Sequence, residues 1–326
     1  MITTYIIPKQ WDNLVDSHHG HPLQLFGWGE VKKVTGSWQV TRLANDNYFA
    51  QILIRKTPLG RFGYIPRGNN FDSDFLRELK AFAQKENLFM LRFEPNVKAT
   101  DWHHKLKKAR DHVLLARTIQ LDLTKSKEEL LATMDSKTRQ YIRRSERDNN
   151  TTIRKARESD LDRILTIYRE TAKRAGFPIH PDSYYRTIFK QMGQNNHIHV
   201  AEINGQVEAF LWCVKTPEVC IELYGGATDL AFQKRANYTL KWHTILTAKG
   251  ICLETVKAAP DSKPVPSRSY DVNGLLNDGI SKFKLGFSGG AEIQLAATSD
   301  LVIKPLNYFF FATLLPLFKR LSSRRT

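Results

Sequence analysis

The sequence is poor in cysteine and in acidic residues, and it has no long apolar run. Its three cysteines, Cys213, Cys220 and Cys252, are odd in number and lack the paired spacing of zinc ligands. This pattern predicts core thiols in a reducing compartment and argues against a disulfide framework. The most apolar stretch, residues 309–318, has about half the length of a membrane-spanning helix. Because residues 1–13 also lack the unbroken apolar core of a secretory peptide, we expect a cytoplasmic protein.

Motifs for metal and nucleotide binding are missing as well. The ten histidines never follow the spacing His-Glu-x-x-His. The adjacent pairs His18-His19 and His103-His104 would point to different faces of any regular element. There is no Gly-x-x-x-x-Gly-Lys loop, which argues against ATP use. We therefore expect neither a metal site nor a cofactor.

Positive charge is what the sequence has in excess. It contains 49 Lys and Arg residues against 33 Asp and Glu residues, a net charge of +16 over 326 residues. Such a surplus is typical of proteins that meet phosphate in nucleic acid, in nucleotide sugars or on an anionic membrane face. The alternative is that the charge serves only solubility. With 41% apolar residues, the chain can bury two cores.

Hydrophobic periodicity predicts an α+β protein built from two mixed series. In the first series, strand-like runs at residues 48–56, 88–93 and 118–123 surround a helix at 72–87. The second series has a strand at 152–156, a helix at 159–175, and hairpin strands at 197–203 and 206–215. Asn204-Gly205 joins the hairpin strands, because this dipeptide supplies the two positive φ angles of a type I′ turn.

A long helix is predicted between the two series, at residues 126–148, where Ser126 and Glu129 form a capping box. A strand at 293–303 and a helix at 305–321 end the pattern. The restart of the pattern and the connecting helix predict two domains that divide near residue 148.

Five stretches carry the functional prediction, and they occur in the order of a known family. They lie at residues 23–32, 63–68, 122–131 running into 137–144, 224–229, and 270–274 followed by 279–287. The last stretch contains Phe-Lys-x-Gly-Phe after a Tyr-Asp strand end. In this order the stretches resemble the FemABX family of non-ribosomal peptidyltransferases, in its compact form without long inserted helical arms.

The resemblance implies two tandem GNAT-like domains, with the last helix packing back on the first domain. Residues 1–148 and 299–326 would form the precursor-binding domain, and residues 149–298 the domain on the aminoacyl-tRNA side. The implied activity is transfer of an amino acid from aminoacyl-tRNA to a peptidoglycan precursor, UDP-MurNAc-pentapeptide or lipid II. Aminoacyl-tRNA and the precursor are thus the expected partners of a monomeric enzyme.

The resemblance assigns the chemistry to Phe283 and Lys284. Aminoacyl transfer needs stabilisation of the oxyanion that develops on the ester carbonyl, and a lysine ammonium beside an aromatic wall can provide it. The alternative is a lysine that merely decorates the surface. Asp271 is a further candidate because it ends a predicted strand, where α/β folds often place site residues, although an aspartate there also caps turns.

By the same resemblance, Lys32 and Arg67 are candidates for phosphate binding, and Tyr184 and Tyr224 for the peptide. Arg67 lies in a predicted turn, where an arginine is more often only solvated. The sequence departs from the family pattern at His180, where an arginine is expected four residues before the tyrosine. Arg174 or Arg186 are possible substitutes in recognition of the stem-peptide carboxylate.

The long helix offers a candidate surface for tRNA. Arg139, Arg143 and Arg147 are spaced four residues apart and form one cationic stripe with Lys137 and Arg144 alongside. A cationic surface binds tRNA without reading its sequence. The alternative is an ordinary solvated face.

Two other functions fit parts of the pattern. A GNAT-like N-acyltransferase could use another acyl donor, but residues 231–238 enter a candidate helix without the glycine expected of a CoA pyrophosphate loop. A non-catalytic module that binds tRNA or a membrane surface would not need the Tyr-Asp and Phe-Lys signatures. Residues 309–318, followed by Lys319 and Arg320, predict peripheral contact with the inner membrane surface.

Overall fold

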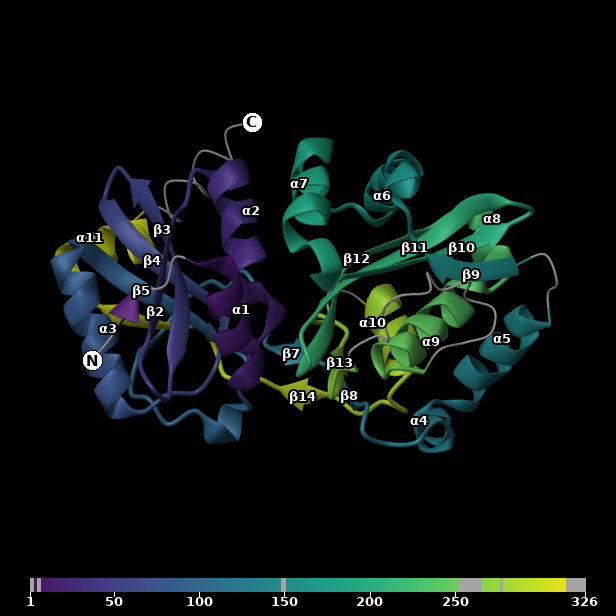
Figure 1. Cartoon of the computed structure of the whole chain (residues 1–326), viewed down its shortest axis with the longest axis horizontal. Coiled ribbons are helices and arrows are strands. Elements are labelled where there is room, and N and C mark those ends of the chain that lie inside the picture. Colours follow the sequence, from purple (N-terminus) through teal and green to yellow (C-terminus); the bar gives the residue numbers. More distant parts are fainter. Residues whose placement is uncertain (1–2, 5–6, 148–150, 252–265, 276–277, 315–326) are drawn as a thin grey trace. The chain divides into compact units, whose positions relative to one another are not determined.

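The computed structural model describes residues 3–4, 7–147, 151–251, 266–275 and 278–314 (Figure 1). The chain forms two compact units, one made of Met1–Ala116 with Gln294–Thr326 and the other of Arg117–Ile293. Each unit has its own sheet and its own hydrophobic core. Among the helices in the described ranges, none combines the length and apolar character needed to span a bilayer.

The first unit is a mixed sheet with helices on both faces (Figure 1). Its strands, in sheet order, are β1 (Thr3–Thr4), β2 (Gln39–Ala44), β3 (Phe49–Thr57), β4 (Gly60–Gly68), β5 (Leu88–Pro95), β15 (Ser299–Val302) and β6 (Lys107–Lys108). Only β4 and β5 pair in parallel among the described neighbours of this sheet. The helices are α1 (Pro8–Ser17), α2 (Phe26–Gly36) and α3 (Ser73–Lys85).

The second unit repeats this plan. Its strands, in sheet order, are β8 (Gln120–Asp122), β13 (Ser269–Asp271), β12 (Val219–Ala227), β11 (Gln206–Lys215), β10 (Asn196–Ile203) and β9 (Thr151–Lys155). Here β12 and β13 form the parallel pair. The helices are α4 (Lys127–Thr133), α5 (Ser136–Glu146), α6 (Leu161–Ala175), α7 (Asp182–Met192), α8 (Asp229–Gln233), α9 (Ala236–Ala248) and α10 (Asp278–Leu285). In Figure 1, α6 and α7 cover one face of the sheet and α9 the other.

The two units share one order of elements. Each has two helices, three antiparallel strands, a helix and then a strand parallel to the third, as in α1-α2-β2-β3-β4-α3-β5 and α6-α7-β10-β11-β12-α9-β13, with the short α8 added in the second. The predicted fold of two tandem GNAT-like domains is therefore confirmed. Two short strands, β7 (Arg117–Thr118) and β14 (Ile293–Gln294), form a separate ladder.

Local signals placed several elements correctly. Asn204 and Gly205 have φ angles of 52° and 78° and join β10 to β11, as the Asn-Gly pair predicts. The capping box at the start of α4 is also present, because Ser126 Oγ accepts from the Glu129 amide and Glu129 accepts from the Ser126 amide. Cys213 and Cys220 are buried free thiols, whereas Cys252 lies outside the described residues.

The predicted helix at residues 126–148 is wrong as a single element. It consists of α4 and α5, which are separated at Met134 and Asp135. Asp135 begins α5 because its side chain accepts a hydrogen bond of 2.5 Å from the Thr138 amide. Asp135 was therefore the sequence signal that a second helix begins inside a stretch that otherwise favours one continuous helix.

The observed units also differ from the division predicted near residue 148. Residues 117–148 lie in the second unit, and residues 294–298 lie in the first. Strand pairing explains the difference, because β8 pairs with β13 in the second sheet. Packing of α5 against α9 adds to it.

The C-terminal return packs on the first unit, as predicted, although its helix is shorter. The predicted strand 293–303 is divided into β14 and β15, and α11 (Pro305–Phe309) is followed by a π-helical turn at Phe310–Leu314. Tyr308 and Phe311 pack against Phe89 and Met90 of β5. The remainder of the helix predicted at 305–321, from residue 315 on, lies outside the described residues.

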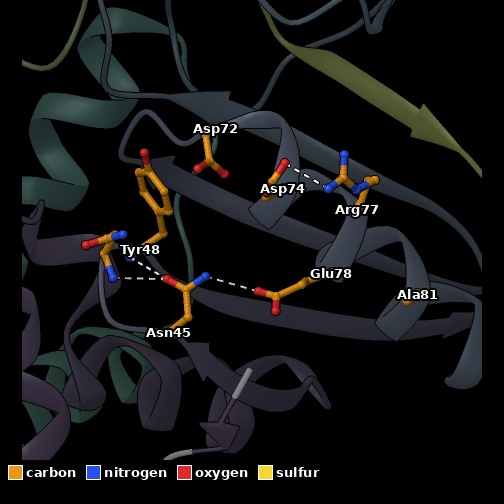
Figure 2. A pocket seen from close by; sticks show the side chains of 8 residues that line it. Asn45, Tyr48, Asp72, Asp74, Arg77, Glu78 and Ala81 are labelled. Atoms are coloured by element: carbon orange, nitrogen blue, oxygen red, sulfur yellow. Dashed lines mark hydrogen bonds and ion pairs between the residues drawn. The ribbon is translucent and has the colours of Figure 1, made fainter. Parts of the chain in front are cut away.

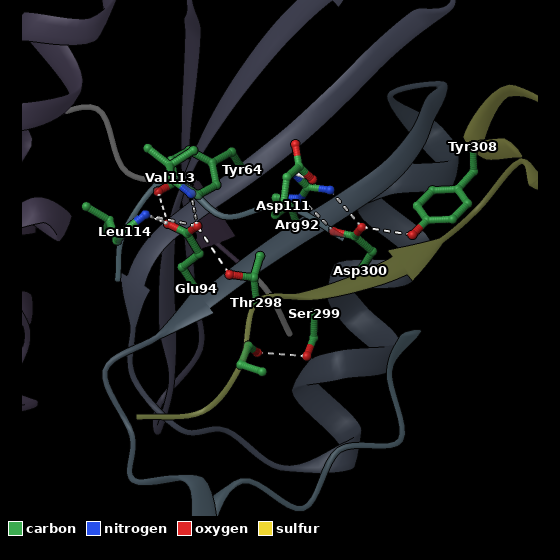
Figure 3. Close-up of polar contacts among 11 residues, drawn as sticks. Tyr64, Arg92, Glu94, Asp111, Val113, Leu114, Thr298, Ser299, Asp300 and Tyr308 are labelled. Atoms are coloured by element: carbon green, nitrogen blue, oxygen red, sulfur yellow. Dashed lines mark hydrogen bonds and ion pairs between the residues drawn. The ribbon is translucent and has the colours of Figure 1, made fainter. Parts of the chain in front are cut away.

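Buried charged groups fix this return (Figure 3). Arg92 of β5 donates two hydrogen bonds, of 2.8 and 2.9 Å, to the Asp300 carboxylate of β15, and Tyr308 donates to the same carboxylate at 3.0 Å. Glu94 accepts hydrogen bonds from the Val113 amide at 2.5 Å and from Thr298 at 3.3 Å. These charge-assisted bonds connect β5 with two segments distant in sequence.

Candidate functional site

Lys284 is part-buried on α10, and two backbone carbonyls hold its side chain. Its Nζ donates to the oxygen of Val272 at 2.5 Å and to that of Gly274 at 2.8 Å. Both carbonyls belong to the segment that follows β13 at the carboxyl end of its parallel pair with β12. An ammonium has three N–H donors. Two carbonyl bonds therefore leave one donor of the charged form for a ligand.

Burial lowers the pKa of Lys284 to about 8, and the positive charge of Lys241 acts in the same direction. The negative charges of Glu222 and Asp271 oppose this effect. Among the described residues, no carboxylate forms an ion pair with Lys284. The side chain is therefore mainly charged at neutral pH, and it loses its proton at a pH about one unit higher.

Asp271 holds the segment that binds Lys284. Its fully buried carboxylate accepts three hydrogen bonds, from Thr118 Oγ1 at 2.7 Å, Gln120 Nε2 at 2.9 Å and the Asn273 amide at 2.7 Å. Thr118 Oγ1 in turn accepts from the Gly274 amide at 2.9 Å. Asp271 thus caps the turn that starts at Asn273, whose φ is 57°, and it positions the two carbonyls rather than contacting Lys284.

Phe283 belongs to an aromatic group that also contains Tyr238 of α9 and Phe287. Its ring centroid lies 4.9 Å from that of Tyr238 and 5.5 Å from that of Phe287. Tyr141 of α5 lies 4.9 Å from Tyr238 and extends the group. The sequence placed Phe283 beside Lys284 as an aromatic wall, and the structure shows that this wall joins α5, α9 and α10.

Gly286 is required by packing between α10 and the start of α5. A Cβ atom there would lie 2.3 Å from Thr138 Oγ1 and 3.0 Å from Asp135 Oδ2. The Gly286 carbonyl also accepts a hydrogen bond of 2.9 Å from the Asp135 amide. The glycine of the Phe-Lys-x-Gly-Phe motif therefore brings the first turn of α5 against the last turn of the helix that carries Lys284.

Two buried charged residues of this site, Glu222 and Lys241, were not predicted from the sequence. Glu222 Oε1 lies 2.6 Å from Lys241 Nζ and accepts a hydrogen bond of 2.8 Å from the Tyr270 hydroxyl. The sequence signal was a single charged residue within an apolar strand, Cys-Ile-Glu-Leu, and another within an apolar helix, Leu-Lys-Trp. Charged residues in such runs are rarely buried without a partner.

The structure brings together three of the residues predicted to bind the precursor. The rings of His180 and Tyr184 stack with centroids 4.0 Å apart, and Tyr185 lies between Tyr184 and Tyr224 at 5.5 and 5.0 Å. Tyr168 is also 5.5 Å from Tyr224. Burial is the main cause that raises the pKa of Tyr224, so its phenol stays neutral and can donate and accept hydrogen bonds.

Lys32 and Arg67 lie in the first unit. The Nζ of Lys32 is 4.6 Å from the centroid of the Trp28 ring on the same helix. Arg67 is near the end of β4 with a φ of 48°, and only 1% of it is exposed. Its Nη2 donates to the Leu115 carbonyl at 2.8 Å. The alternative interpretation of Arg67 as a solvated turn arginine is therefore wrong, because Arg67 belongs to a strand and is buried, and its candidacy for phosphate binding stays a prediction.

The predicted cationic stripe on α5 is partly exposed. Lys137, Arg143 and Arg147 are exposed, and so is Arg144. Arg139 is half-buried, and its guanidinium donates to the Met134 carbonyl. Of the predicted cationic surface, Arg139 is therefore the residue that does not extend fully into solvent.

A shallow depression in the first unit contains none of the predicted site residues (Figure 2). Asp72, Asp74 and Glu78 make its lining acidic. Glu78 accepts a hydrogen bond of 3.0 Å from Asn45, and Asp74 pairs with Arg77 at 2.9 Å. Within the described residues, no group of three or more His, Cys, Asp or Glu side chains is arranged to hold a metal ion.

Comparisons with known proteins agree with the ordered motifs. The FemAB family matches residues 101–210. A lipid II:glycine glycyltransferase of Staphylococcus aureus is 27% identical over 221 residues, which cover 59% of this chain. The chain spans about half the length of the curated relatives it matches, 52% in this case.

Solved structures share the fold. A crystal structure of FemX has a TM-score of 0.81 at 17% identity and covers 96% of this chain and 100% of that chain. The structure of L-PGS from Bacillus licheniformis has a TM-score of 0.52 at 13% identity, with 94% and 96% coverage. These findings agree with the resemblance recognised from the motifs: residues 101–210 match the FemAB family, and the chain has the fold of FemX.

Proposed function

We propose that the protein is a transferase that builds peptidoglycan interpeptide bridges. It moves an amino acid from aminoacyl-tRNA to an amine on the stem peptide of UDP-MurNAc-pentapeptide or lipid II. The observation that carries this proposal is Lys284, a part-buried lysine whose charge is poised near neutral pH and whose ammonium is aimed by two carbonyls. The relatives named lipid II:glycine glycyltransferase support the same class of reaction.

The reaction requires a group that stabilises the negative charge that develops on the ester carbonyl oxygen. The acceptor amine forms a C–N bond with the aminoacyl carbon, and the bond from that carbon to the tRNA ribose oxygen breaks. The amine loses one proton and the ribose oxygen gains one, so no cofactor is required. Lys284 donates the third N–H of its ammonium to the oxyanion of the tetrahedral intermediate, where a preorganised donor is most effective.

The donor side of the site would lie at α5 and α10. The exposed cations Lys137, Arg143 and Arg144 are on α5, and Arg147 directly follows it. The first turn of α5 packs against Gly286, the residue after α10. A tRNA backbone along α5 would thus bind close to the helix that carries Lys284. Contacts of this kind with phosphate provide affinity and depend on salt rather than on base sequence.

The acceptor side would use the aromatic cluster of His180, Tyr184 and Tyr224. Phenols and an imidazole can donate and accept hydrogen bonds with the polar groups of a peptide. Lys32 of the first unit is one candidate for the precursor phosphates. Arg67 is the other candidate, but only 1% of it is exposed, so a contact with a precursor phosphate would have to be made from inside that unit.

The test is a transfer assay with purified protein, a panel of charged tRNAs and both forms of the precursor. Mass spectrometry of the precursor should show the addition of one amino acid residue with at least one charged tRNA. A product formed equally well with an acyl-CoA in place of the charged tRNA would favour another acyl donor. Absence of product with every donor, together with tRNA binding, would favour a non-catalytic module.

A further inference from the structure

A buried ion pair beside Lys284 joins three elements of the second unit. Glu222 of β12 and Lys241 of α9 are 7% and 2% exposed, and their charged atoms are 2.6 Å apart. Tyr270 of β13, which is fully buried, donates its hydroxyl to the same Glu222 oxygen at 2.8 Å. Burying two charges is costly unless they are paired and hydrogen-bonded. Such a pair adds little stability over apolar side chains, which points to a role other than packing.

Lys241 connects this pair to the helix that carries Lys284. Its Nζ lies 5.3 Å from the ring centroid of Phe283 and 5.2 Å from that of Phe287. These two residues precede and follow Lys284 in the Phe-Lys-x-Gly-Phe motif. A cation over two aromatic rings attracts both of them, more strongly when it is desolvated. The position of Lys241 therefore sets the position of α10 relative to β13.

The charges around Lys284 come from a small set of groups. Glu222 and Asp271 are the negative ones, and Lys241 is the positive one. Asp271 has its two oxygens engaged by three donors from other residues. Tyr270, which donates to Glu222, and Cys213, which contacts the Tyr270 hydroxyl, are neutral groups, because burial is the main cause that raises both of their pKa values. Glu222 and Lys241 are thus the charged neighbours of Lys284 that are paired with each other.

We propose that the Glu222–Lys241 ion pair is the positioning device of Lys284: it fixes α10 through Phe283 and Phe287, and it balances the charge that Lys284 experiences. This inference rests on the proposed transferase function, in which Lys284 acts as an ammonium. Glu222 and Lys241 are positioning residues, because they act through Lys284 and its helix.

The two partners have opposite effects on Lys284. Without the negative charge of Glu222, Lys241 remains as an unbalanced cation next to Lys284, which disfavours a second positive charge. Without the positive charge of Lys241, Glu222 remains as an unbalanced anion, which favours the ammonium. If Glu222 and Lys241 served only for packing, their replacement would not shift the proton affinity of Lys284 in opposite directions.

The experiment measures the protonation of Lys284 without tRNA or precursor. Full-length protein is labelled briefly with acetic anhydride between pH 6 and 10, and mass spectrometry quantifies acetylation of the peptide that contains Lys284. Only the neutral amine reacts, so the pH of half-maximal labelling reports its proton affinity. We expect that affinity to fall about tenfold or more in Glu222→Gln and to rise about tenfold or more in Lys241→Met.

Controls separate this effect from misfolding and from failure of the proposed function. The double variant Glu222→Gln/Lys241→Met carries no unpaired charge and should label near the wild-type pH. Glu202→Gln removes one partner of another part-buried ion pair, 2.5 Å from Arg154 on β9, and should leave Lys284 unchanged. Shifts in the same direction, or no shift in either single variant, would overturn the inference. If the opposite shifts appear but no donor supports aminoacyl transfer, the pairing stands and the proposed function fails.

Discussion

Acid should weaken the second unit through three histidines that the fold keeps neutral. His197 and His199 of β10 have ring centroids 4.6 Å apart and face α9, where His243 and Thr247 lie. Burial lowers the pKa of His199 to about 3 and that of His243 to about 4, and it lowers the pKa of His197 well below its usual value. Nearby cations, including Lys155 and Lys215, act in the same direction on His197 and His199.

The size of the effect follows from proton binding. In the unfolded chain each histidine takes up a proton below the ordinary histidine pKa of 6.5, whereas in the folded protein it stays neutral down to a much lower pH. The unfolded state therefore binds more protons, and stability falls as the pH drops below about 6.5. At pH 5 the loss is about 2 kcal/mol for each histidine. Three histidines give about 6 kcal/mol, a large part of the usual 5–15 kcal/mol.

Urea unfolding followed by circular dichroism at pH 7.5 and pH 5 tests this reasoning, with His199→Phe as the variant. The replacement removes one proton-binding group and keeps an apolar ring in the core. We expect it to reduce the loss of unfolding free energy between the two pH values by about 2 kcal/mol. His103→Gln is the control, because His103 is exposed. An equal pH dependence of wild type and His199→Phe would refute the reasoning.

Three further predictions concern the site and its partners. Asp271→Asn should lower turnover and cost about 1–3 kcal/mol of unfolding free energy, measured by urea titration, because the carboxylate accepts three buried hydrogen bonds. Replacing Arg143 and Arg144 with Ala should weaken tRNA binding and reduce its logarithmic salt slope by up to about 2, whereas an unchanged slope would remove α5 from the interface. Leu306→Ser should reduce sedimentation with anionic vesicles, because Leu306 of α11 is 76% exposed, while Val34→Ser, at an equally apolar residue of α2 that is 67% exposed, should not. If the wild-type protein does not sediment with anionic vesicles, the predicted membrane contact is wrong.

Local patterns predicted the elements whose signals lie within a few residues. The Asn204-Gly205 hairpin and the capping box of α4 depend only on neighbouring residues, and both were found correctly. The ordered motifs likewise indicated the family resemblance and singled out Phe283 and Lys284, although these two residues lie on the helix α10 and not in a turn. These features are independent of how distant segments pair.

Features that depend on distant pairing were missed. The segment with Thr118 and Gln120 was assigned to the first domain, because nothing in its own sequence shows that β8 pairs with β13. Arg67 was expected in a turn, because Pro-Arg-Gly is a sequence typical of turns. In the structure Arg67 lies at the end of β4 and donates to the carbonyl of Leu115, a residue distant in sequence. The pairing of Glu222 with Lys241 joins a strand and a helix nineteen residues apart along the chain. Each residue alone looks like an isolated charge in an apolar run.

The rate of a single turnover in Lys284 variants tests the central claim most directly. Single-turnover transfer from a charged tRNA to the precursor is measured against pH for wild type, Lys284→Met and Lys284→Arg. If the ammonium stabilises the oxyanion, Lys284→Met should slow transfer by about 100-fold to 1,000-fold. The wild-type rate should fall as the pH rises through about 8, where Lys284 loses its proton, and Lys284→Arg should keep part of the rate without that fall. A Lys284→Met enzyme with an unchanged rate and only weaker precursor binding would contradict the account.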